Sequence, residues 1–408
     1  MTTDATANQP QQAPVQAVIT TLVAIETEMN AMFLEREQAI RELLVSLLAC
    51  QHCVLIGDPG TGKSAMIEEI CARVSDGTGN GLSLFSYLMT KFTQTDEVFG
   101  PVSFNGMKNE TYNRVIAKRL PDSEIAFLDE IWKSSSAILN AVLKIVNERK
   151  FTNGTTVIDV PLMSIFAASN ELPEGDDLEA IRDRMLFTHF VNHLSDANFE
   201  LLMLRKAGLE PDPFTFQKTT IGRSDLVKLQ AYTRTIRFTR PVISAFTAVR
   251  RELAAEGIII SERRNGYCLQ LMQANAVIEA RDEVNEDDLA ILYDALWLEP
   301  SQRATVSKII NQHSNPINAR ASELKDEADT IYSQTMQALE ANKQDRTKRT
   351  MAAAEGAGKL QKILDELTQL QAQATKTGRN TKRLDQAVTA AQQQHMDLLK
   401  AVGFKMNL

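Results

Sequence analysis

Between residues 50 and 195, mostly apolar runs alternate with stretches in which apolar residues return every three or four positions. Apolar runs are typical of strands that are buried on both faces of a sheet, whereas the wider spacing predicts amphipathic helices. The expected strands are residues 54–56, 84–88, 125–128 and 163–168. Strands that alternate with helices predict a parallel sheet between helices, which is an α/β fold.

Helical and hairpin patterns flank these strands. Residues 17–48 and 136–148 keep a helical spacing of apolar positions. Residues 151–160 surround an Asn-Gly pair, which favours a β-hairpin turn. We therefore place an α/β domain at residues 17–195, and we interpret residues 1–16, which are rich in Thr, Gln, Pro and Ala, as a disordered tail.

After residue 195 the pattern is helical throughout. We expect helices at residues 241–256 and 266–280, and a third helix that begins after Asn285 and ends near residue 298. The Asn285 side chain can cap that third helix, and the acidic residues of its first turn suit the helix dipole. Residues 196–300 are therefore predicted to form an all-helical domain.

The last hundred residues are rich in Gln, Ala and Lys. Leucine and isoleucine keep a three-to-four spacing on both sides of a polar break at residues 375–382. This pattern predicts an antiparallel helical hairpin or short coiled coil within residues 301–408. We interpret its basic residues as solvated charge, because no aromatic residues are interleaved with them for base stacking.

Charge and composition narrow the function. The net charge is −8, but residues 301–408 hold 16 Lys and Arg against 11 Asp and Glu, which leaves −13 on residues 1–300. An acidic main body argues against a core that binds nucleic acid. No apolar stretch reaches the length of about 18 residues that a membrane span needs, and the N-terminus lacks the pattern of a signal peptide. We therefore expect a cytoplasmic protein without membrane insertion.

The four cysteines give little support to a redox or metal site. Cys50 and Cys53 have C-x-x-C spacing, but no second pair completes a tetrahedral zinc site. The pair also adjoins an expected buried strand, where small core residues are common. We interpret these two cysteines, together with Cys71 and Cys268, as structural.

One segment between the strand at 54–56 and the following helix fits the phosphate-binding pattern G-x-x-x-x-G-K-[ST] without a mismatch. Its glycines let successive backbone N–H groups surround an anion, and the helix N-terminus adds the positive end of its dipole. The lysine is expected to reach the β- and γ-phosphates of ATP, and the serine hydroxyl to bind Mg²⁺. The candidate nucleotide-binding residues are Gly57, Asp58, Pro59, Gly60, Thr61, Gly62, Lys63 and Ser64.

Two carboxylates, Asp129 and Glu130, follow the strand at 125–128. Ligands of open α/β sheets bind at the carboxyl ends of the strands, so these side chains should lie beside the phosphate loop. Asp129 is expected to hold Mg²⁺, directly or through water, and Glu130 to polarise the attacking water as a general base. The pair therefore extends the prediction from nucleotide binding to nucleotide hydrolysis.

The order of these motifs resembles that of AAA+ ATPases, more narrowly the MoxR family, and within it the RavA-like branch. The resemblance covers roughly residues 30–300. It is carried by residues 57–64, 87–90, 97–101, 127–133, 137–140, 147–149, 167–173 and 183–185.

The resemblance implies roles for further residues. Asn170 matches sensor 1, an amide that helps to place the attacking water against the γ-phosphate. Arg184 matches the arginine finger that is inserted into the neighbouring subunit's site, with Arg182 as the alternative. A planar and permanently charged guanidinium suits that task. Arg263 looks like sensor 2, which reports the nucleotide state from the helical lid, with Arg264 as the competing residue.

The resemblance also implies an assembly and a partner. Because finger and phosphate loop come from different subunits, a homohexameric ring is expected. Residues 99–109 and the 151–160 hairpin resemble insertions by which this clade contacts substrates or partners. RavA-like proteins work with a von Willebrand A-domain (vWA) protein, so a partner of that class is expected. Their β-rich C-terminal module, which binds a lysine decarboxylase, has no counterpart in residues 301–408, so that connection is not carried over.

Three functions are compatible with these residues. The leading one is a chaperone-like ATPase that remodels, loads or matures a partner protein. The second is an ATP-dependent assembly switch with slow turnover, and trapping of ATP-bound rings by Glu130→Gln would separate the two. The third is a nucleic-acid-acting AAA+ subunit, for which stimulation by DNA and loss of binding at raised salt would be the signature.

Overall fold

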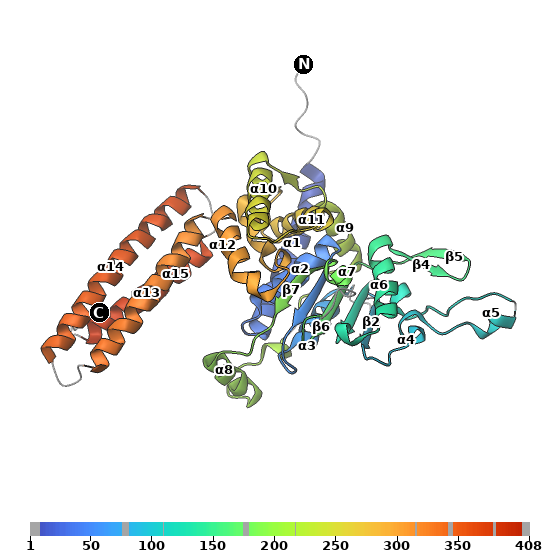
Figure 1. Cartoon of the computed structure of the whole chain (residues 1–408), viewed down its shortest axis with the longest axis horizontal. Helices are drawn as coiled ribbons and strands as arrows, with labels where there is room; N and C mark the ends of the chain where they lie inside the picture. Colours follow the sequence, from blue (N-terminus) through green and yellow to red (C-terminus); the bar gives the residue numbers. More distant parts are fainter. Residues whose placement is uncertain are drawn as a thin grey trace, which may run out of the picture. The chain divides into compact units, whose positions relative to one another are not determined.

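The computed structural model divides into two units, which are described separately: Met1–Val242 with Ile258–Pro300, and Ile243–Gly257 with Ser301–Leu408. Their helices and strands are labelled in Figure 1. The structure describes residues 9–75, 81–108, 110–173, 179–216, 218–314, 316–341, 346–377 and 381–401. Within those ranges, no helix combines the length and the apolar character that crossing a membrane requires.

A parallel sheet of five strands forms the centre of the first unit, in the order β2-β3-β6-β1-β7. The four strands predicted from the apolar runs are confirmed. The fifth, β7, was not predicted, because Thr188 and His189 interrupt its apolar run at the edge of the sheet. The strands are β1 (His52–Ile56), β2 (Leu84–Leu88), β3 (Ile125–Asp129), β6 (Ser164–Ser169) and β7 (Met185–Phe190).

Helices flank the sheet (Figure 1), and buried apolar residues from helices and strands form its core. Residues 136–148 form the helix that their spacing predicts, with Ile138, Val142 and Ile145 buried. The helices and 3-10 turns of this part are α1 (Gln9–Met32), α2 (Glu37–Ala49), α3 (Lys63–Arg73), η1 (Leu120–Asp122), η2 (Ile131–Lys133), α6 (Ser136–Glu148) and α7 (Glu179–Arg182).

The first helix begins earlier than predicted. α1 starts at Gln9, so residues 9–16 are helical rather than part of a disordered tail, and residues 1–8 lie outside the described ranges. Ile19, Leu22 and Ile25 are buried on one side of α1. Once such a face has nucleated a helix, each added residue costs little, so the helix can extend into the polar turns that precede it.

Two insertions leave the sheet after β2 and after α6 (Figure 1). The second is the predicted hairpin, and its turn residue Gly154 has the positive φ, 64°, that an Asn-Gly turn requires. Asn153 joins the two insertions, because its Oδ1 accepts from the Arg114 N–H at 2.6 Å and its Nδ2 donates to the Arg114 carbonyl at 3.1 Å. The elements are α4 (Thr95–Phe99), α5 (Phe104–Lys108), β4 (Lys150–Asn153) and β5 (Thr156–Asp159).

The region after β7 is mainly helical, with two corrections. Arg237 and Glu283 belong to a two-residue parallel ladder, too short to leave an alternating pattern in the sequence, so the region is not helical throughout. The helix capped by Asn285 is a 3-10 helix that ends at Ala295, although the cap itself is confirmed. The remaining elements of the first unit are α8 (Asp196–Lys206), η4 (Pro213–Thr215), α9 (Arg223–Thr233), β8 (Arg237–Phe238), α11 (Glu262–Ile278), β9 (Glu283–Val284) and η5 (Glu286–Ala295).

The second unit has a core of its own, formed where three long helices, α13, α14 and α15, pack side by side (Figure 1). The predicted hairpin is therefore corrected to a three-helix bundle, in which α14 and α15 correspond to the hairpin. The leucine pattern does not indicate α13, because much of its buried face consists of small residues such as Ala321 and Ala328. The elements are α10 (Arg240–Ala255), η6 (Pro300–Gln302), α12 (Arg303–Ser314), α13 (Pro316–Ala341), α14 (Arg346–Thr377) and α15 (Lys382–Ala401).

Candidate active site

The phosphate loop connects β1 to α3 and has the backbone of an anion-binding turn. Gly60 and Gly62 have φ values of 82° and 88°, a left-handed conformation that residues with a Cβ rarely adopt. Gly57 is needed for a different reason, since a Cβ there would lie 2.4 Å from the Val191 carbonyl oxygen. A glycine-rich turn that leads directly into a helix N-terminus favours phosphate binding.

Lys63 is the first residue of α3 and only 7% exposed. Its ammonium donates to the carbonyl oxygens of Gly57 at 2.6 Å and Asp58 at 2.9 Å, and it lies 3.5 Å from Asn170 Oδ1. Burial lowers the pKa of Lys63, and nearby carboxylates, Asp129 foremost, oppose that shift. The lysine is thus a fixed, partly desolvated cation inside the loop, as binding of phosphates requires.

Asp129 ends β3, and Glu130 follows with a φ of 53°. A left-handed backbone is costly for a glutamate, and such strain is concentrated at functional sites. The Glu130 N–H donates to Asp129 Oδ1 at 3.0 Å. Burial raises the pKa of the Asp129 carboxyl, and this hydrogen bond partly offsets the rise. A cation beside Asp129 would therefore be favoured electrostatically.

Two neighbours hold the Glu130 carboxylate. Its Oε1 accepts from Asn170 Nδ2 at 2.5 Å. Its Oε2 lies 3.2 Å from Lys133 Nζ, close enough for an ion pair but not aligned as a hydrogen bond. Asn170 directly follows β6, the neighbour of β3 in the sheet. Adjacent strand ends thus bring Asp129, Glu130 and Asn170 together beside Lys63.

Arg184 lies in another part of the first unit. Its Nε donates to Asn147 Oδ1 at 2.8 Å, and its Nη1 lies 3.5 Å from Asp183 Oδ2. The alternative finger, Arg182, lies over the ring of Trp297, with its guanidinium carbon 5.6 Å from the ring centroid. Arg184 is thus held by neighbours outside the Lys63 cluster, as we expect of a finger that acts on another subunit.

Arg184 also lines a pocket of about 220 Å³. Among the described residues, two further arginines line it, Arg149 and Arg234, and none of the phosphate loop does. Arg149 follows α6 and Arg234 follows α9, so three separate elements contribute a guanidinium to this pocket. Such a concentration of positive charge favours an anionic ligand.

The structure distinguishes the two candidates for sensor 2. Arg264 is buried and donates to the carbonyl oxygens of Ala295 at 2.7 Å, Asp183 at 2.9 Å and Leu186 at 2.7 Å. Its guanidinium therefore holds two backbone segments, residues 183–186 and Ala295, against α11. Arg263 precedes it on α11 and is exposed. These contacts give Arg264 a structural role, whereas the sensor role of Arg263 stays a prediction.

One contact of the phosphate loop was missed by the sequence analysis. His193 Nε2 lies 2.9 Å from Asp58 Oδ2, and both side chains are largely exposed. His193 comes after β7, the strand that the apolar runs do not indicate. Recognition of residues 185–187 as the start of a strand parallel to β1 would have placed His193 near the phosphate loop.

The cysteine environments agree with a structural role. Burial raises the pKa of the Cys53 thiol well above its usual range and that of Cys268 to about 12. The thiolate is the form that reacts and binds metals, so such surroundings oppose both activities. The core interpretation is confirmed for Cys53 and Cys268, whereas Cys50 and Cys71 are only half-buried.

A phosphate loop, a strand ending in Asp-Glu and a mainly helical region after the sheet together define a nucleotide-binding α/β fold of the AAA+ type. Residues 20–231 match the model of the MoxR domain in the MoxR-vWA-beta-propeller ternary systems, and residues 241–310 match an AAA lid domain. The chain belongs to the MoxR family of AAA+ ATPases.

Relatives of the chain agree with this assignment. The uncharacterized proteins MJ0079 and MJ0812 of Methanocaldococcus jannaschii are each 36% identical, over 76% and 77% of this chain and 78% and 81% of theirs. The chaperone MoxR1 of Mycobacterium tuberculosis is 25% identical over 52% of this chain and 54% of its own. These similarities support a MoxR-type ATPase, while membership of the RavA-like branch stays a prediction.

A solved structure shares the fold. It comes from Cytophaga hutchinsonii, is provisionally described as an ATPase, and superposes with a TM-score of 0.59 at 18% identity. The match covers 75% of this chain and 97% of that one. At this identity the likeness concerns the fold alone.

Proposed function

We propose that the chain hydrolyses ATP to ADP and phosphate at the site formed by the phosphate loop, Asp129, Glu130 and Asn170. The observation that carries the proposal is the contact between Glu130 and Asn170 at 2.5 Å, with Lys63 3.5 Å from the same asparagine. A carboxylate, an amide and an ammonium therefore converge beside the phosphate loop. In this arrangement Glu130 takes a proton from water, Asn170 orients that water, and Lys63 neutralises the β- and γ-phosphates.

The same site offers ligands for Mg²⁺. Ser64 follows Lys63 on α3 and Asp129 ends β3, so one helix start and one strand end supply a hydroxyl and a carboxylate. Hard oxygen donors of this kind suit Mg²⁺, which when bound would neutralise charge on the phosphates. The raised pKa of the Asp129 carboxyl shows a carboxylate whose burial lacks full compensation by the protein.

The decisive variant is Glu130→Gln, which keeps the size of the side chain and removes the base. We expect the ATP hydrolysis rate to fall by about 10²–10⁴-fold, because a positioned general base contributes that much. ATP affinity, measured by equilibrium binding of a fluorescent analogue, should stay close to that of the parent chain. Glu68→Gln, an exposed glutamate on α3, is the matched control and should leave the rate unchanged. Equal rates for both variants would instead favour an assembly switch with slow turnover.

The proposal extends to a chaperone-like role on a vWA-domain protein. The matched MoxR model is defined for systems in which MoxR and vWA proteins occur together. The two insertions expose apolar side chains that a partner could cover, among them Phe104 (67%), Tyr112 (59%) and Val157 (57%). The exchange of hydrogen bonds between Asn153 and Arg114 gives these insertions a defined mutual geometry. They are therefore the proposed contact surface for the partner.

A purified vWA-domain protein would test this role. Its addition should change the ATP hydrolysis rate of the parent chain, and the double variant Phe104→Ser with Tyr112→Ser should lose that response. The basal rate of the double variant should stay unchanged, because neither residue contacts the phosphate loop or Glu130. Leu209→Ser, an apolar residue that is 73% exposed outside the insertions, is the matched control. An unchanged response of the double variant would remove the insertions from the partner surface.

A further inference from the structure

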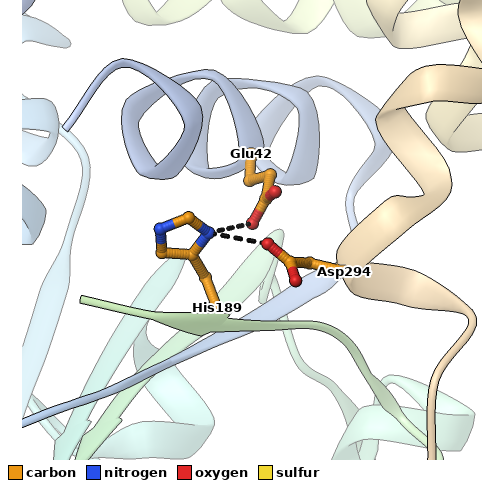
Figure 2. A group of neighbouring side chains, drawn as sticks. All are labelled: Glu42, His189 and Asp294. Carbon is orange, nitrogen blue, oxygen red and sulfur yellow. Dashed lines mark hydrogen bonds and ion pairs between the residues drawn. The ribbon is translucent and has the colours of Figure 1, made fainter. Parts of the chain in front are cut away.

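Three titratable side chains from three separate elements meet in the interior of the first unit (Figure 2). Glu42 lies on α2, His189 on β7 and Asp294 on η5. The His189 Nδ1 atom is 2.8 Å from Asp294 Oδ2 and 3.3 Å from Glu42 Oε2. Their ligand-type atoms all lie within 4.8 Å of one another. Two carboxylates therefore converge on one imidazole nitrogen.

Hydrogen bonding inside this cluster is incomplete. The His189 Nδ1 atom can carry one hydrogen. Because Nδ1 lies 2.8 Å from Asp294 Oδ2, that hydrogen is shared with Asp294. Glu42 Oε2 is completely buried and accepts no hydrogen bond from any part of the chain that the structure describes. A buried carboxylate oxygen without a donor is costly, so each such atom in a native structure calls for a proton or a ligand.

The outer oxygens of both carboxylates are already engaged. Glu42 Oε1 accepts from Gln38 Nε2 at 2.7 Å, and Asp294 Oδ1 accepts from the Trp297 indole N–H at 3.1 Å. With these oxygens engaged, Glu42 Oε2 and Asp294 Oδ2 face His189, and Figure 2 shows one oxygen of each carboxylate directed at the imidazole. Metal sites commonly have such supporting hydrogen bonds, which fix the orientation of the ligands.

Charge balance also favours a divalent ion. Two carboxylates with side-chain exposures of 0% and 1% face a single imidazole. With a protonated imidazole and two carboxylates the cluster keeps a net charge of −1. A proton on Glu42 or a divalent ion beside a neutral imidazole each brings it to zero, and the ion also gives Glu42 Oε2 a partner. Because burying uncompensated charge is expensive, a neutral state is favoured, and the divalent ion is one of the two.

We propose that Glu42, His189 and Asp294 form a structural binding site for one divalent transition-metal ion, with Zn²⁺ as the best match. Bonds of about 2.0–2.2 Å from nitrogen and oxygen to tetrahedral zinc place neighbouring ligand atoms about 3.4 Å apart. The separation of Nδ1 from Glu42 Oε2 is already 3.3 Å, and that from Asp294 Oδ2 would widen from 2.8 Å. A nitrogen ligand and only two carboxylates disfavour Ca²⁺ and Mg²⁺.

Such an ion would connect the sheet to the lid. Glu42 and His189 fall within the residues matched by the MoxR model, and Asp294 within those matched by the lid model. Val191 directly follows the strand that carries His189, and its N–H donates to the Ile56 carbonyl at 2.7 Å just before the phosphate loop. The ion would thus stabilise the junction that supports the phosphate loop, a role separate from ATP hydrolysis.

Zinc content of the full chain is the first measurement. The purified chain is incubated with Zn²⁺ in the absence of nucleotide, dialysed, and analysed for zinc per chain. We expect about one zinc in the parent chain, and affinity at least about ten-fold weaker in Glu42→Gln and in His189→Gln. His395→Gln, a histidine of the second unit, is the matched control and should keep the zinc. Zinc content no higher in the parent chain than in Glu42→Gln would overturn the proposal.

Cysteines are the competing ligands for zinc. A second pair of measurements distinguishes a cysteine site from the proposed one. The double variant Cys50→Ala with Cys53→Ala should retain the zinc, and Co²⁺ bound in its place should show no thiolate-to-cobalt charge-transfer band. Zinc should raise the Tm of the parent chain without nucleotide and leave that of Glu42→Gln unchanged, because only a folded site binds the ion. Loss of zinc in the cysteine variant, or a thiolate band, would assign the ion elsewhere and contradict the site.

Discussion

Neighbouring residues at the ends of two strands give the candidate active site its chemistry. Asp129 and Glu130 are consecutive, yet their surroundings differ: a backbone N–H stabilises the Asp129 carboxylate, and the Asn170 amide holds that of Glu130. The left-handed backbone at Glu130 turns the chain between them. Two carboxylates in different surroundings can take different tasks, and those proposed here are a metal ligand and a base.

Two adjacent arginines should respond to the same substitution in different ways. Arg264→Met keeps most of the side-chain volume but leaves the buried carbonyls of Ala295, Asp183 and Leu186 without their donor. We expect the free energy of unfolding to fall by about 3 kcal/mol. Arg263→Met, at an exposed position, should change it by less than about 0.5 kcal/mol and instead lower the ATP hydrolysis rate. Urea denaturation and a steady-state assay would measure both, and similar losses of stability would contradict the division of roles.

The residues of the candidate active site could be picked out from the sequence because their signals are local. The phosphate-loop pattern and the apolar run before Asp129 each span only a few consecutive residues. The choice between Arg263 and Arg264 could not be made in this way. It depends on which side of α11 faces the carbonyls of residues 183–186, and those contacts join segments about 80 residues apart in the sequence.

How clearly the sequence indicates a helix or strand depends on how that element is buried. β1 and β6 are buried on both faces, and their apolar runs predict them directly. β7 lies at the edge of the sheet and carries the polar pair Thr188 and His189, so its pattern is weak. α13 presents alanines to its neighbours, and alanine does not mark a buried face as leucine does. Edge strands and alanine-lined helices are therefore the elements that sequence patterns miss.

Close packing of the long helices in the second unit leads to a prediction for two glycines of α14. A Cβ on Gly356 would lie 2.4 Å from Thr335 Oγ1 and 3.1 Å from Leu398 Cδ1, whereas one on Gly358 would meet nothing within 4 Å. Gly356→Ala should therefore destabilise the bundle by about 1–3 kcal/mol through overpacking. Gly358→Ala should stabilise it by about 0.5–1 kcal/mol, because alanine favours the helix. Thermal unfolding followed by circular dichroism would show the opposite signs, and shifts in the same direction would exclude tight packing at Gly356.

The whole molecule combines a MoxR-type ATPase core with a helical bundle that has its own hydrophobic core. The α/β class and the helical character of the following region could be predicted from periodicity alone. The three-helix composition of the bundle could not, since two of its helices show a leucine pattern and the third does not. No local sequence pattern indicates the number of subunits or which surfaces they share. The expected homohexamer therefore rests on the proposed role of one residue, Arg184.

Arg184 offers a test of assembly at the scale of the whole molecule. Its side chain contacts Asn147 and Asp183 and lines a pocket that no described residue of the phosphate loop lines, so we expect hydrolysis that needs Arg184 to join two subunits. We expect specific ATPase activity to rise with protein concentration. Arg184→Ala should lower the rate by about 10³-fold or more, as loss of an arginine finger does. Arg184→Lys should recover little of that rate, because an ammonium lacks the planar fork of the guanidinium.

Mixing two inactive variants provides the control for this prediction. Arg184→Ala retains Glu130, and Glu130→Gln retains Arg184, so a mixed assembly contains junctions at which an intact loop faces an intact finger. Activity should therefore reappear on mixing, and Arg182→Ala should not behave in this way if Arg184 is the finger. Activity that is independent of concentration, together with no recovery on mixing, would mean that each chain works alone. The ring would then be excluded, and a monomeric ATP switch would be the better account of the same site.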